Sequence, residues 1–237
     1  MAEHNIHNIP QDSWKQAAGT AAAQLVEDGM VIGLGTGSTA AFLVYALAQR
    51  IQQGLKIVGA VPSSQATYEL ASKLDVPLTD LDTHPNLDLY IDGADEIDPQ
   101  LNLLKGAGGA LMREKIVATA ARRFVVIGDI TKPVEHLLTH FPLPVEVIPF
   151  AATPVFKQLT AMGAVATLRK VADSPFITDN HNVIFDCTFV RGIPEPLTLH
   201  TQIKKIIGVV ETGFFLGMAE RAIIAGPDGV KIIVAGA

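Results

Sequence analysis

The sequence predicts an α/β fold joined to a second, smaller α+β domain, and three observations lead to this prediction. Short apolar segments alternate with helical segments through the first half of the chain. The alternation changes at a proline cluster, residues 141–144 (FPLP), and a Gly-Pro-Asp-Gly turn at 226–229 lies between two apolar runs. With 237 residues, 49% of them hydrophobic, the chain can bury a substantial core, which excludes a disordered or fibrous protein.

Helices of the first half are expected where small and apolar residues recur at helical spacing, at 13–27, 40–49, 67–73 and 111–121. Asp12 or Ser13 is the predicted N-cap of the first helix. Strands are expected at 30–32, 56–61, 87–91 and 124–127. Because these strands are short and almost entirely apolar, they indicate a Rossmann-like open parallel sheet covered by helices on both faces.

Beyond the proline cluster the expected order of elements is βαββαβ, which is the ferredoxin-like split unit. Its strands are predicted at 145–148, 164–169, 183–187 and 209–215, and its helices at 154–162 and 198–206. A final hairpin, 222–225 with 230–234, is expected to return to the first domain. The predicted domains are therefore a catalytic α/β domain of residues 1–141 with 211–237, and a small α+β domain of residues 142–210.

Charge and composition exclude several classes of partner. The net charge is −6 and no basic stripe is visible, so no nucleic-acid partner is expected. No stretch approaches the roughly 18 apolar residues of a membrane span, and the first residues lack an apolar signal core. Cys187 is the one cysteine and has no partner for an internal disulfide. We expect a cytoplasmic protein without membrane contacts.

Polar and glycine-rich segments follow each predicted strand of the first domain. In open α/β sheets, ligands bind beyond the carboxyl ends of the strands, so these segments mark the expected site. The segments are 33–39 (GLGTGST), 62–67 (PSSQAT), 92–96 (DGADE) and 128–132 (GDITK).

The first of these segments is typical of a phosphate-binding loop. Its glycines, Gly37 among them, allow amides to approach an anion at the start of a helix, and Thr36, Ser38 and Thr39 add hydroxyl groups. The GxGxG spacing does not fit the dinucleotide fingerprint, and no lysine precedes the Ser-Thr pair as in a P-loop. A plain glycine-rich turn is the alternative.

The acidic segment 92–98 (DGADEID) has three readings that the residues alone leave open. Its carboxylates could bind Mg²⁺, form a solvated acidic turn, or take part in acid/base catalysis near a cation. Lys105 lies nine residues beyond Glu96 and offers that cation.

The segment that starts at Lys105 (KGAGGALMREK) has the composition of an amide nest that could stabilise an oxyanion. Glu114 falls in the first turns of the following helix, as a catalytic group or as a simple dipole partner. None of the seven histidines lies in these segments, so a histidine base is not expected; His136 and His140 are read as surface residues. Lys15 and Lys132 are candidates for anion contacts or ordinary solvated lysines.

Five segments together resemble type A ribose-5-phosphate isomerase: GLGTGSTAAF, YIDGADEID, KGAGGALMREKIV, GDITK and FPLPVEVIP. The similarity runs in order from about Lys15 to the final GPDGVKIIV. The pair YIDGADE and KGxGGAxxREK is highly specific, whereas the glycine loop alone is not. Ala107 and Gly109 stand where relatives vary between glycine and alanine, and the first ten residues lie outside the similarity.

The resemblance implies interconversion of D-ribose 5-phosphate and D-ribulose 5-phosphate through an enediolate, in the non-oxidative pentose phosphate pathway. It implies no metal, no organic cofactor and a homodimer or homotetramer. By the family pattern Glu114 is the general base, and Asp92 and Asp95 contact sugar hydroxyls and assist ring opening. Lys105 with Gly106, Ala107 and Gly108 stabilises the enediolate. The other substrate-binding positions are Thr36, Gly37, Ser38, Thr39, Gly93, Ala94, Lys132 and Lys15.

Other functions share this kind of fold, so the fold alone does not decide between them. An amino-sugar phosphate deaminase would need a histidine near the acidic segment, and a CoA-transferase would use a glutamate nucleophile on acyl-CoA. Phosphogluconolactonases belong to the same neighbourhood. A sugar-phosphate sensor would keep the phosphate loop but would not need Asp92, Asp95, Lys105 and Glu114 together.

Overall fold

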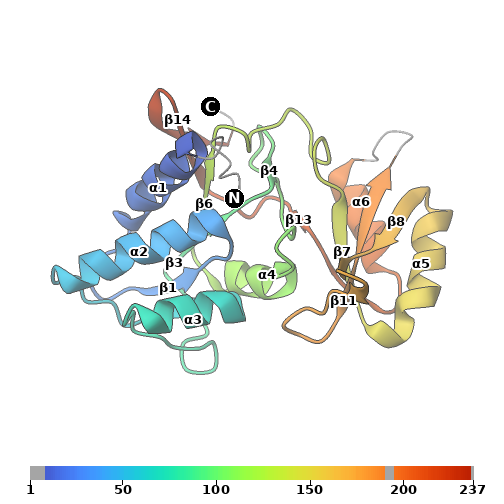
Figure 1. Cartoon of the computed structure of the whole chain (residues 1–237), viewed down its shortest axis with the longest axis horizontal. Coiled ribbons are helices and arrows are strands. Elements are labelled where there is room, and N and C mark those ends of the chain that lie inside the picture. The colour runs from blue at the N-terminus through green and yellow to red at the C-terminus, as the bar shows by residue number, and fades with distance from the viewer. Residues whose placement is uncertain (1–8, 190–194, 236–237) are drawn as a thin grey trace, which may run out of the picture. The chain divides into compact units, whose positions relative to one another are not determined.

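The computed structural model describes residues 9–189 and 195–235, and it divides the chain into two compact units (Figure 1). Unit 1 comprises Met1–Ala94, Val117–Lys132 and Ala219–Ala237, and unit 2 comprises Asp95–Ile116 and Pro133–Met218. The chain therefore passes between the units several times. No helix in the described ranges is long and apolar enough to cross a membrane.

Unit 1 contains the predicted open sheet, with six strands in the order β15-β14-β6-β3-β1-β2. Five strands are parallel, and β15 pairs antiparallel with β14 at one edge. The strands are β1 (Val31–Leu34), β2 (Gly59–Pro62), β3 (Leu89–Gly93), β6 (Phe124–Asp129), β14 (Arg221–Gly226) and β15 (Gly229–Val234). The predicted C-terminal hairpin is confirmed, and β14 joins it to the first sheet through β6.

Strands β1 and β6 are buried along their whole length, because helices cover the sheet. The helices contact the sheet through small and branched side chains. The helices are α1 (Ile9–Ala23), α2 (Ser38–Gln52) and α3 (Gln65–Lys73). Ala18 and Ala22 of α1 and Leu43 and Leu47 of α2 lie in one buried cluster with strand residues. The predicted N-cap is wrong, since α1 begins at Ile9 and Asp12 lies inside its first turn. There the negative charge of Asp12 interacts favourably with the positive end of the helix dipole.

Unit 2 contains the predicted ferredoxin-like sheet, antiparallel and in the order β12-β7-β11-β8. Its elements in chain order are β7 (Leu143–Val147), η1 (Pro149–Ala151), α5 (Ala152–Ala161), β8 (Ala164–Leu168), β11 (Val183–Phe189), α6 (Pro196–Lys204) and β12 (Val209–Thr212). Helices α5 and α6 bury Val155, Leu159, Leu199 and Ile203 in the core of this unit.

Four short strands of unit 2 were not predicted. The hairpin of β9 (Lys170–Val171) and β10 (Ser174–Pro175) lies between β8 and β11, and β4 (Glu96–Ile97) and β5 (Leu103–Leu104) form a three-stranded sheet with β13 (Phe214–Phe215). The predicted strand 209–215 is split at Gly213, whose amide donates to the Pro144 carbonyl. A Cβ at Gly213 would lie 2.2 Å from the Lys105 carbonyl oxygen, so only glycine fits there.

The predicted domain boundaries at 141/142 and 210/211 differ from this division. Residues 95–116 and 133–141 belong to unit 2, because β5 pairs with β13 and the Glu96 carboxylate binds the segment 138–141. The first turns of α4 (Leu111–Ala120) accordingly lie in unit 2 and its last residues in unit 1. Pairings between residues far apart in the sequence produce this division, and composition does not reveal them.

Candidate active site

The glycine loop between β1 and α2 is anchored by Asp92 at the end of β3. The Thr36 amide donates to Asp92 Oδ1 over 2.9 Å, and a Cβ at Gly35 would lie 2.1 Å from the same oxygen. Gly37 has a φ of +102°, a conformation that favours glycine. Thus two glycines serve a clear purpose here: one allows close approach to the acid and the other allows the turn into the helix.

The Asp92 carboxylate is fully buried and already has several donors. Oδ1 accepts from the amides of Thr36 and Gly93, and Oδ2 accepts from the Tyr90 hydroxyl. These bonds hold β1, its loop and β3 in a fixed register. Within unit 1, therefore, Asp92 shapes the glycine loop.

The Thr36 hydroxyl lies in a cluster of side-chain hydroxyl groups. Its oxygen lies 2.8 Å from Ser63 Oγ and 2.9 Å from Ser64 Oγ, and Thr67 donates to the Gly35 carbonyl. This cluster ties the glycine loop to the start of α3. Sequence reasoning noted the serine-rich segment after β2 but gave it no role.

The remaining polar groups of the glycine loop lie at the start of α2. Gly37 and Ser38 are exposed and Thr39 is buried at the first turn of the helix. The first amides of a helix have no intrahelical partner, and the helix dipole makes this end favourable for an anion. The geometry of this turn thus supports anion binding.

The other predicted substrate contacts of unit 1 lie on β3, β6 and α1. Gly93 and Ala94 are half-buried at the end of β3, and Lys132 follows β6 with its side chain against Gly128. The Lys15 ammonium lies 3.6 Å from Asp12 Oδ1 within α1. Asp129, beside Lys132, is buried, yet its hydrogen bonds from Thr131 hold its pKa below the usual value.

Two acids of the 92–98 segment have structural roles in unit 2. The Glu96 carboxylate is 1% exposed and accepts backbone amides from Leu138, Thr139, His140 and Phe141. Asp98 accepts the amides of Gln100 and Asn102 in a tight turn. Across the described residues no group of three or more metal-ligating side chains is assembled, so the magnesium reading gains no support.

Lys105 and Glu114 form a buried pair in unit 2. The Lys105 ammonium lies 3.4 Å from Glu114 Oε2, and the two side chains are only 3% and 6% exposed. The Lys105 backbone amide donates to the Gly213 carbonyl, and its ammonium lies 5.4 Å from the centroid of the Phe215 ring. A cation and a carboxylate are thus held side by side, away from water, at the start of α4.

The loop between these two residues has the predicted nest-like conformation. Gly106 and Gly109 have φ values of +107° and +81°. The Ala107 amide donates to Asp95 Oδ2 over 2.9 Å, whereas the amides of Gly106 and Gly108 have no hydrogen-bond partner within the described part of the chain. Of the three predicted amide donors, one is therefore engaged by Asp95, and the two that we call open have no partner in the described chain, Gly106 at a buried position and Gly108 at an exposed one.

Lys115 is a buried cation that the sequence interpretation missed. Burial is the main cause that lowers its pKa to about 8, although Glu211 lies 2.8 Å away. Its ammonium also donates to the Thr212 carbonyl and lies 4.8 Å from the Phe215 centroid. Lys115 directly follows the candidate base Glu114 in the sequence, and this neighbouring position was the signal that could have identified it as part of the site.

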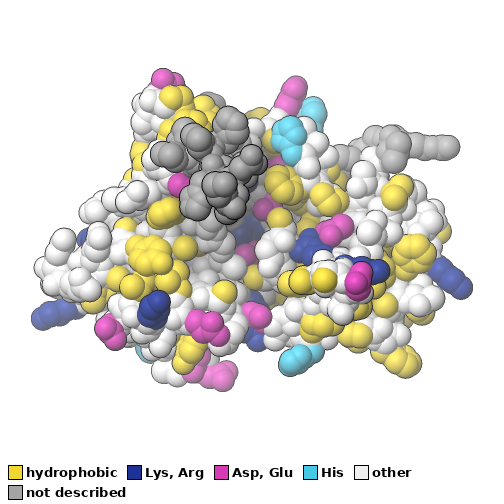
Figure 2. Space-filling view, in the orientation of Figure 1, with side chains coloured by type: hydrophobic (Ala, Val, Ile, Leu, Met, Phe, Trp, Pro, Cys, Tyr) yellow, Lys and Arg dark blue, Asp and Glu magenta, His cyan; other side chains and the backbone are white. Residues whose placement is uncertain are grey.

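Figure 2 shows the charged side chains on one face of the molecule. On this face the Lys and Arg side chains are scattered and form no continuous basic stripe. This distribution gives no footprint for a nucleic-acid backbone on that face.

Comparison with known proteins identifies the family. A family model described as Ribose 5-phosphate isomerase A (phosphoriboisomerase A) matches residues 59–229. Ribose-5-phosphate isomerase A of Synechococcus sp. (strain JA-3-3Ab) is 52% identical over 225 residues, covering 94% of this chain and 97% of that protein. The protein of the same name from Bacillus mycoides is 50% identical over 217 residues, covering 92% and 97%.

Solved structures agree with the sequence comparison. The ribose 5-phosphate isomerase of Plasmodium falciparum has a TM-score of 0.91 at 38% identity and covers 95% of this chain and 100% of its own. A D-ribose-5-phosphate isomerase in complex with phospho-erythronic acid has a TM-score of 0.90 at 40% identity, with 94% and 99% covered. The chain belongs to the ribose 5-phosphate isomerase A family.

Proposed function

We propose that this chain is an aldose-ketose isomerase that interconverts D-ribose 5-phosphate and D-ribulose 5-phosphate through an enediolate. The observation that carries the proposal is the buried Lys105–Glu114 pair beside a glycine loop with open amides. Family membership supplies the identity of the sugar, and the geometry supports the type of reaction.

Glu114 is the proposed general base. Isomerisation requires a proton to leave C2 of the open-chain aldose and return at C1, and one carboxylate can perform both transfers. The Glu114 carboxylate is fixed by α4 and by Lys105 at 3.4 Å, so it needs little rearrangement to act. Lys105 is proposed to balance the charge that develops on the sugar oxygens as the proton leaves.

The Gly106–Gly108 loop and Asp95 are proposed to bind the reacting end of the sugar. Removal of a proton beside a carbonyl places negative charge on oxygen, which fixed amide donors stabilise. The amides of Gly106 and Gly108 are open, and Asp95 is half-buried with one oxygen bound to the Ala107 amide. Asp95 is proposed to exchange protons with the sugar hydroxyls, and Asp92 to assist in ring opening.

The loop of unit 1 is proposed to bind the phosphate. The first turn of α2 offers the amides and hydroxyls of Ser38 and Thr39 to an anion. Thr36, Gly37, Gly93 and Ala94 are proposed to line the substrate. Lys15 and Lys132 are proposed as further phosphate contacts.

A direct assay tests this proposal. Purified protein should convert ribose 5-phosphate to ribulose 5-phosphate, with arabinose 5-phosphate and unphosphorylated ribose as poor substrates. Absence of turnover on ribose 5-phosphate would refute the proposal and favour a sensor that keeps only binding. Activity should survive exhaustive EDTA treatment, since four fixed groups (Glu114, Lys105, Asp95 and the amides) suffice for the chemistry; loss on chelation would refute the metal-free mechanism.

The cytoplasm and a homodimeric or homotetrameric assembly complete the proposal. The assembly comes from the family resemblance, and the single cysteine fits the reducing cytoplasm. Light scattering of the purified protein measures the assembly directly.

A further inference from the structure

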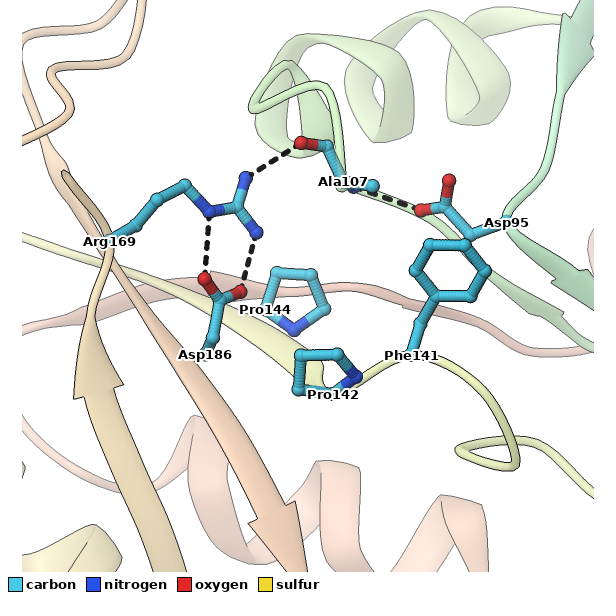
Figure 3. A pocket seen from close by; sticks show the side chains of 7 residues that line it. All are labelled: Asp95, Ala107, Phe141, Pro142, Pro144, Arg169 and Asp186. Atoms are coloured by element: carbon cyan, nitrogen blue, oxygen red, sulfur yellow. Dashed lines mark hydrogen bonds and ion pairs between the residues drawn. The ribbon is translucent and has the colours of Figure 1, made fainter. Parts of the chain in front are cut away.

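We infer that Arg169 is a positioning residue that sets the conformation of the 105–109 loop, a role that rests on the proposed function. Arg169 follows β8 in unit 2, and its guanidinium donates to the Gly106 carbonyl oxygen at 2.7 Å. It also donates to the Ala107 carbonyl oxygen at 3.1 Å (Figure 3). It thus binds the backbone of the loop whose amides are proposed to stabilise the enediolate.

The guanidinium is itself fixed on its other edge. Nε and one terminal nitrogen donate to the two oxygens of Asp186 on β11, at 2.9 and 2.5 Å. Arginine alone among the side chains offers a rigid planar fork that binds a carboxylate on one edge and carbonyl oxygens on another. The Arg169–Asp186 pair is mostly buried, with side-chain exposures of 14% and 24%.

The geometry of a trans peptide explains how this contact acts on the amides. In a trans peptide the carbonyl of one residue and the amide of the next point in opposite directions, and no described peptide bond is cis. The Gly106 carbonyl points to Arg169, so the Ala107 amide points the other way, toward Asp95. The Ala107 carbonyl also points to Arg169, which directs the open Gly108 amide to the side of Asp95.

Arg169 therefore orients two consecutive amides toward the side where Asp95 lies. Successive amides that point to one side form an anion-binding nest. Asp95 and Arg169 bind opposite ends of the same Gly106–Ala107 peptide group, so moving either one turns that group. Sub-ångström placement of such donors matters greatly for catalysis.

Neighbouring residues hold Arg169 in this position. Phe176 lies under the guanidinium, 5.9 Å from ring centroid to Cζ, and packs on Gly109, where a Cβ would lie 2.3 Å from the ring. The Phe176 amide donates to the Arg169 carbonyl. These contacts fix the arginine and the last glycine of the loop together.

Stability alone does not account for the pair. Buried ion pairs contribute little net stability, because desolvation offsets the attraction between the charges. The cavity of about 220 Å³ beside the pair is lined by Asp95, Ala107 and Arg169, among others, so the pair also lies next to open space. Its specific consequence is the direction of the loop peptides.

The test compares Arg169→Ala and Arg169→Lys with Arg123→Ala. Arg123 is the matched control, since it also pairs with a carboxylate, Glu220, but contacts no residue of the 105–109 loop in the described structure. We expect Arg169→Ala to lower kcat about tenfold to a hundredfold, somewhat less than loss of one oxyanion donor. KM should stay within about threefold, because phosphate binding is retained. The kcat of Arg169→Lys should lie between that of Arg169→Ala and that of the wild type.

Three further readouts separate positioning from a general structural defect. Guanidinium ion should restore part of the kcat of Arg169→Ala. Phospho-erythronic acid, which bears a planar carboxylate at the reacting end, should lose affinity in parallel with kcat/KM. Amide hydrogen exchange at Ala107 and Gly109 should accelerate at least about tenfold in Arg169→Ala and not in Arg123→Ala.

Two outcomes would overturn the inference. A folded Arg169→Ala variant with normal kcat and normal exchange at Ala107 would refute it while the wild type remains an active isomerase. An Arg169→Ala defect that follows the loss of thermal stability, without guanidinium rescue, would reduce the residue to a structural one. An inactive wild type would instead refute the proposed function, and this inference with it.

Discussion

The two glycine-rich loops of this protein are anchored by different side chains. In the 33–39 loop, the Asp92 carboxylate accepts a backbone amide, and a hydroxyl cluster binds the Thr36 side chain. In the 105–109 loop, Asp95 accepts the Ala107 amide, and the Arg169 guanidinium binds the carbonyls of Gly106 and Ala107. A carboxylate that anchors a loop occupies an amide, whereas a guanidinium binds carbonyls and occupies no amide.

This difference matches the proposed division of chemistry. The first loop keeps its open donors at the start of α2, where the phosphate is proposed to bind. The second loop keeps unpartnered amides within its own turn, beside the proposed base Glu114 and the cation Lys105, where negative charge would develop only during the proposed reaction. Two loops of similar glycine content are therefore proposed to bind two kinds of anion.

The largest expected effect is the loss of the base beside the second loop. Glu114→Gln should lower kcat by at least about a hundredfold, the usual scale for a general base. Substrate should still bind, because the proposed phosphate contacts are untouched. Steady-state kinetics and calorimetric binding of ribose 5-phosphate measure the two effects, with circular dichroism to verify folding. Near-normal turnover would remove Glu114 from the mechanism.

A glycine-to-alanine substitution should change the free energy of unfolding differently in the two loops. Gly35→Ala should lower the free energy of unfolding by about 2 kcal/mol, because the new Cβ collides with Asp92. Gly108→Ala is the matched change in the second loop and should be nearly neutral for stability, since no atom lies within 4 Å of the new Cβ. Urea denaturation measures both. Equal destabilisation would show that the two loops are not anchored as described.

The hydroxyl cluster predicts a smaller effect in the first loop. Thr36→Val should cost about 1 kcal/mol of stability, because it removes the hydroxyl that bonds the Ser63 and Ser64 side chains, and Ser64 then keeps only Thr67 as a partner. Thr36→Ser keeps the hydroxyl and is the control. If Thr36→Val instead raises KM for ribose 5-phosphate at unchanged stability, Thr36 binds substrate directly and does not act as an anchor.

A pH-dependent effect on stability is expected from Lys115 on α4. Its pKa of about 8 in the folded protein lies below the ordinary lysine value, so the unfolded chain binds more protons between these values. Stability from this group is therefore lowest below pH 8 and rises as pH increases above 8, by at most about 1.4 kcal/mol per pH unit. Urea denaturation at pH 7.5, 8.5 and 9.5 should show this rise in the wild type and a weaker one in Lys115→Met. Identical pH profiles would contradict the shifted pKa.

Local sequence patterns predicted the elements better than their connections. The alternation of apolar segments located all four parallel strands of the first half, and the βαββαβ order was correct. The boundaries at 141 and 211 differ from the observed division, because β5 pairs with β13 across more than a hundred residues. Such pairings depend on which strands meet, and no local pattern encodes them.

The acidic segment illustrates the same limit at the level of single side chains. The sequence marked Asp92, Asp95, Glu96 and Asp98 as one cluster. In the structure Asp92 anchors a loop of unit 1, whereas Glu96 binds four amides of a segment more than forty residues away. Sequence spacing shows that these acids lie at the end of a strand, but the partners of each acid depend on the packing around it.

By itself, the sequence determined the two glycine loops, the order of the main helices and strands of both units, and the identity of the family. Backbone conformation and amphipathic spacing are local properties, so residues near one another in the chain suffice to specify them. Only the tertiary structure decided that Arg169 binds Gly106, because these residues are 63 positions apart and meet through the pairing of β8 with β11 and the fold of unit 2. The direction of the loop amides, which the proposed chemistry requires, follows from that contact.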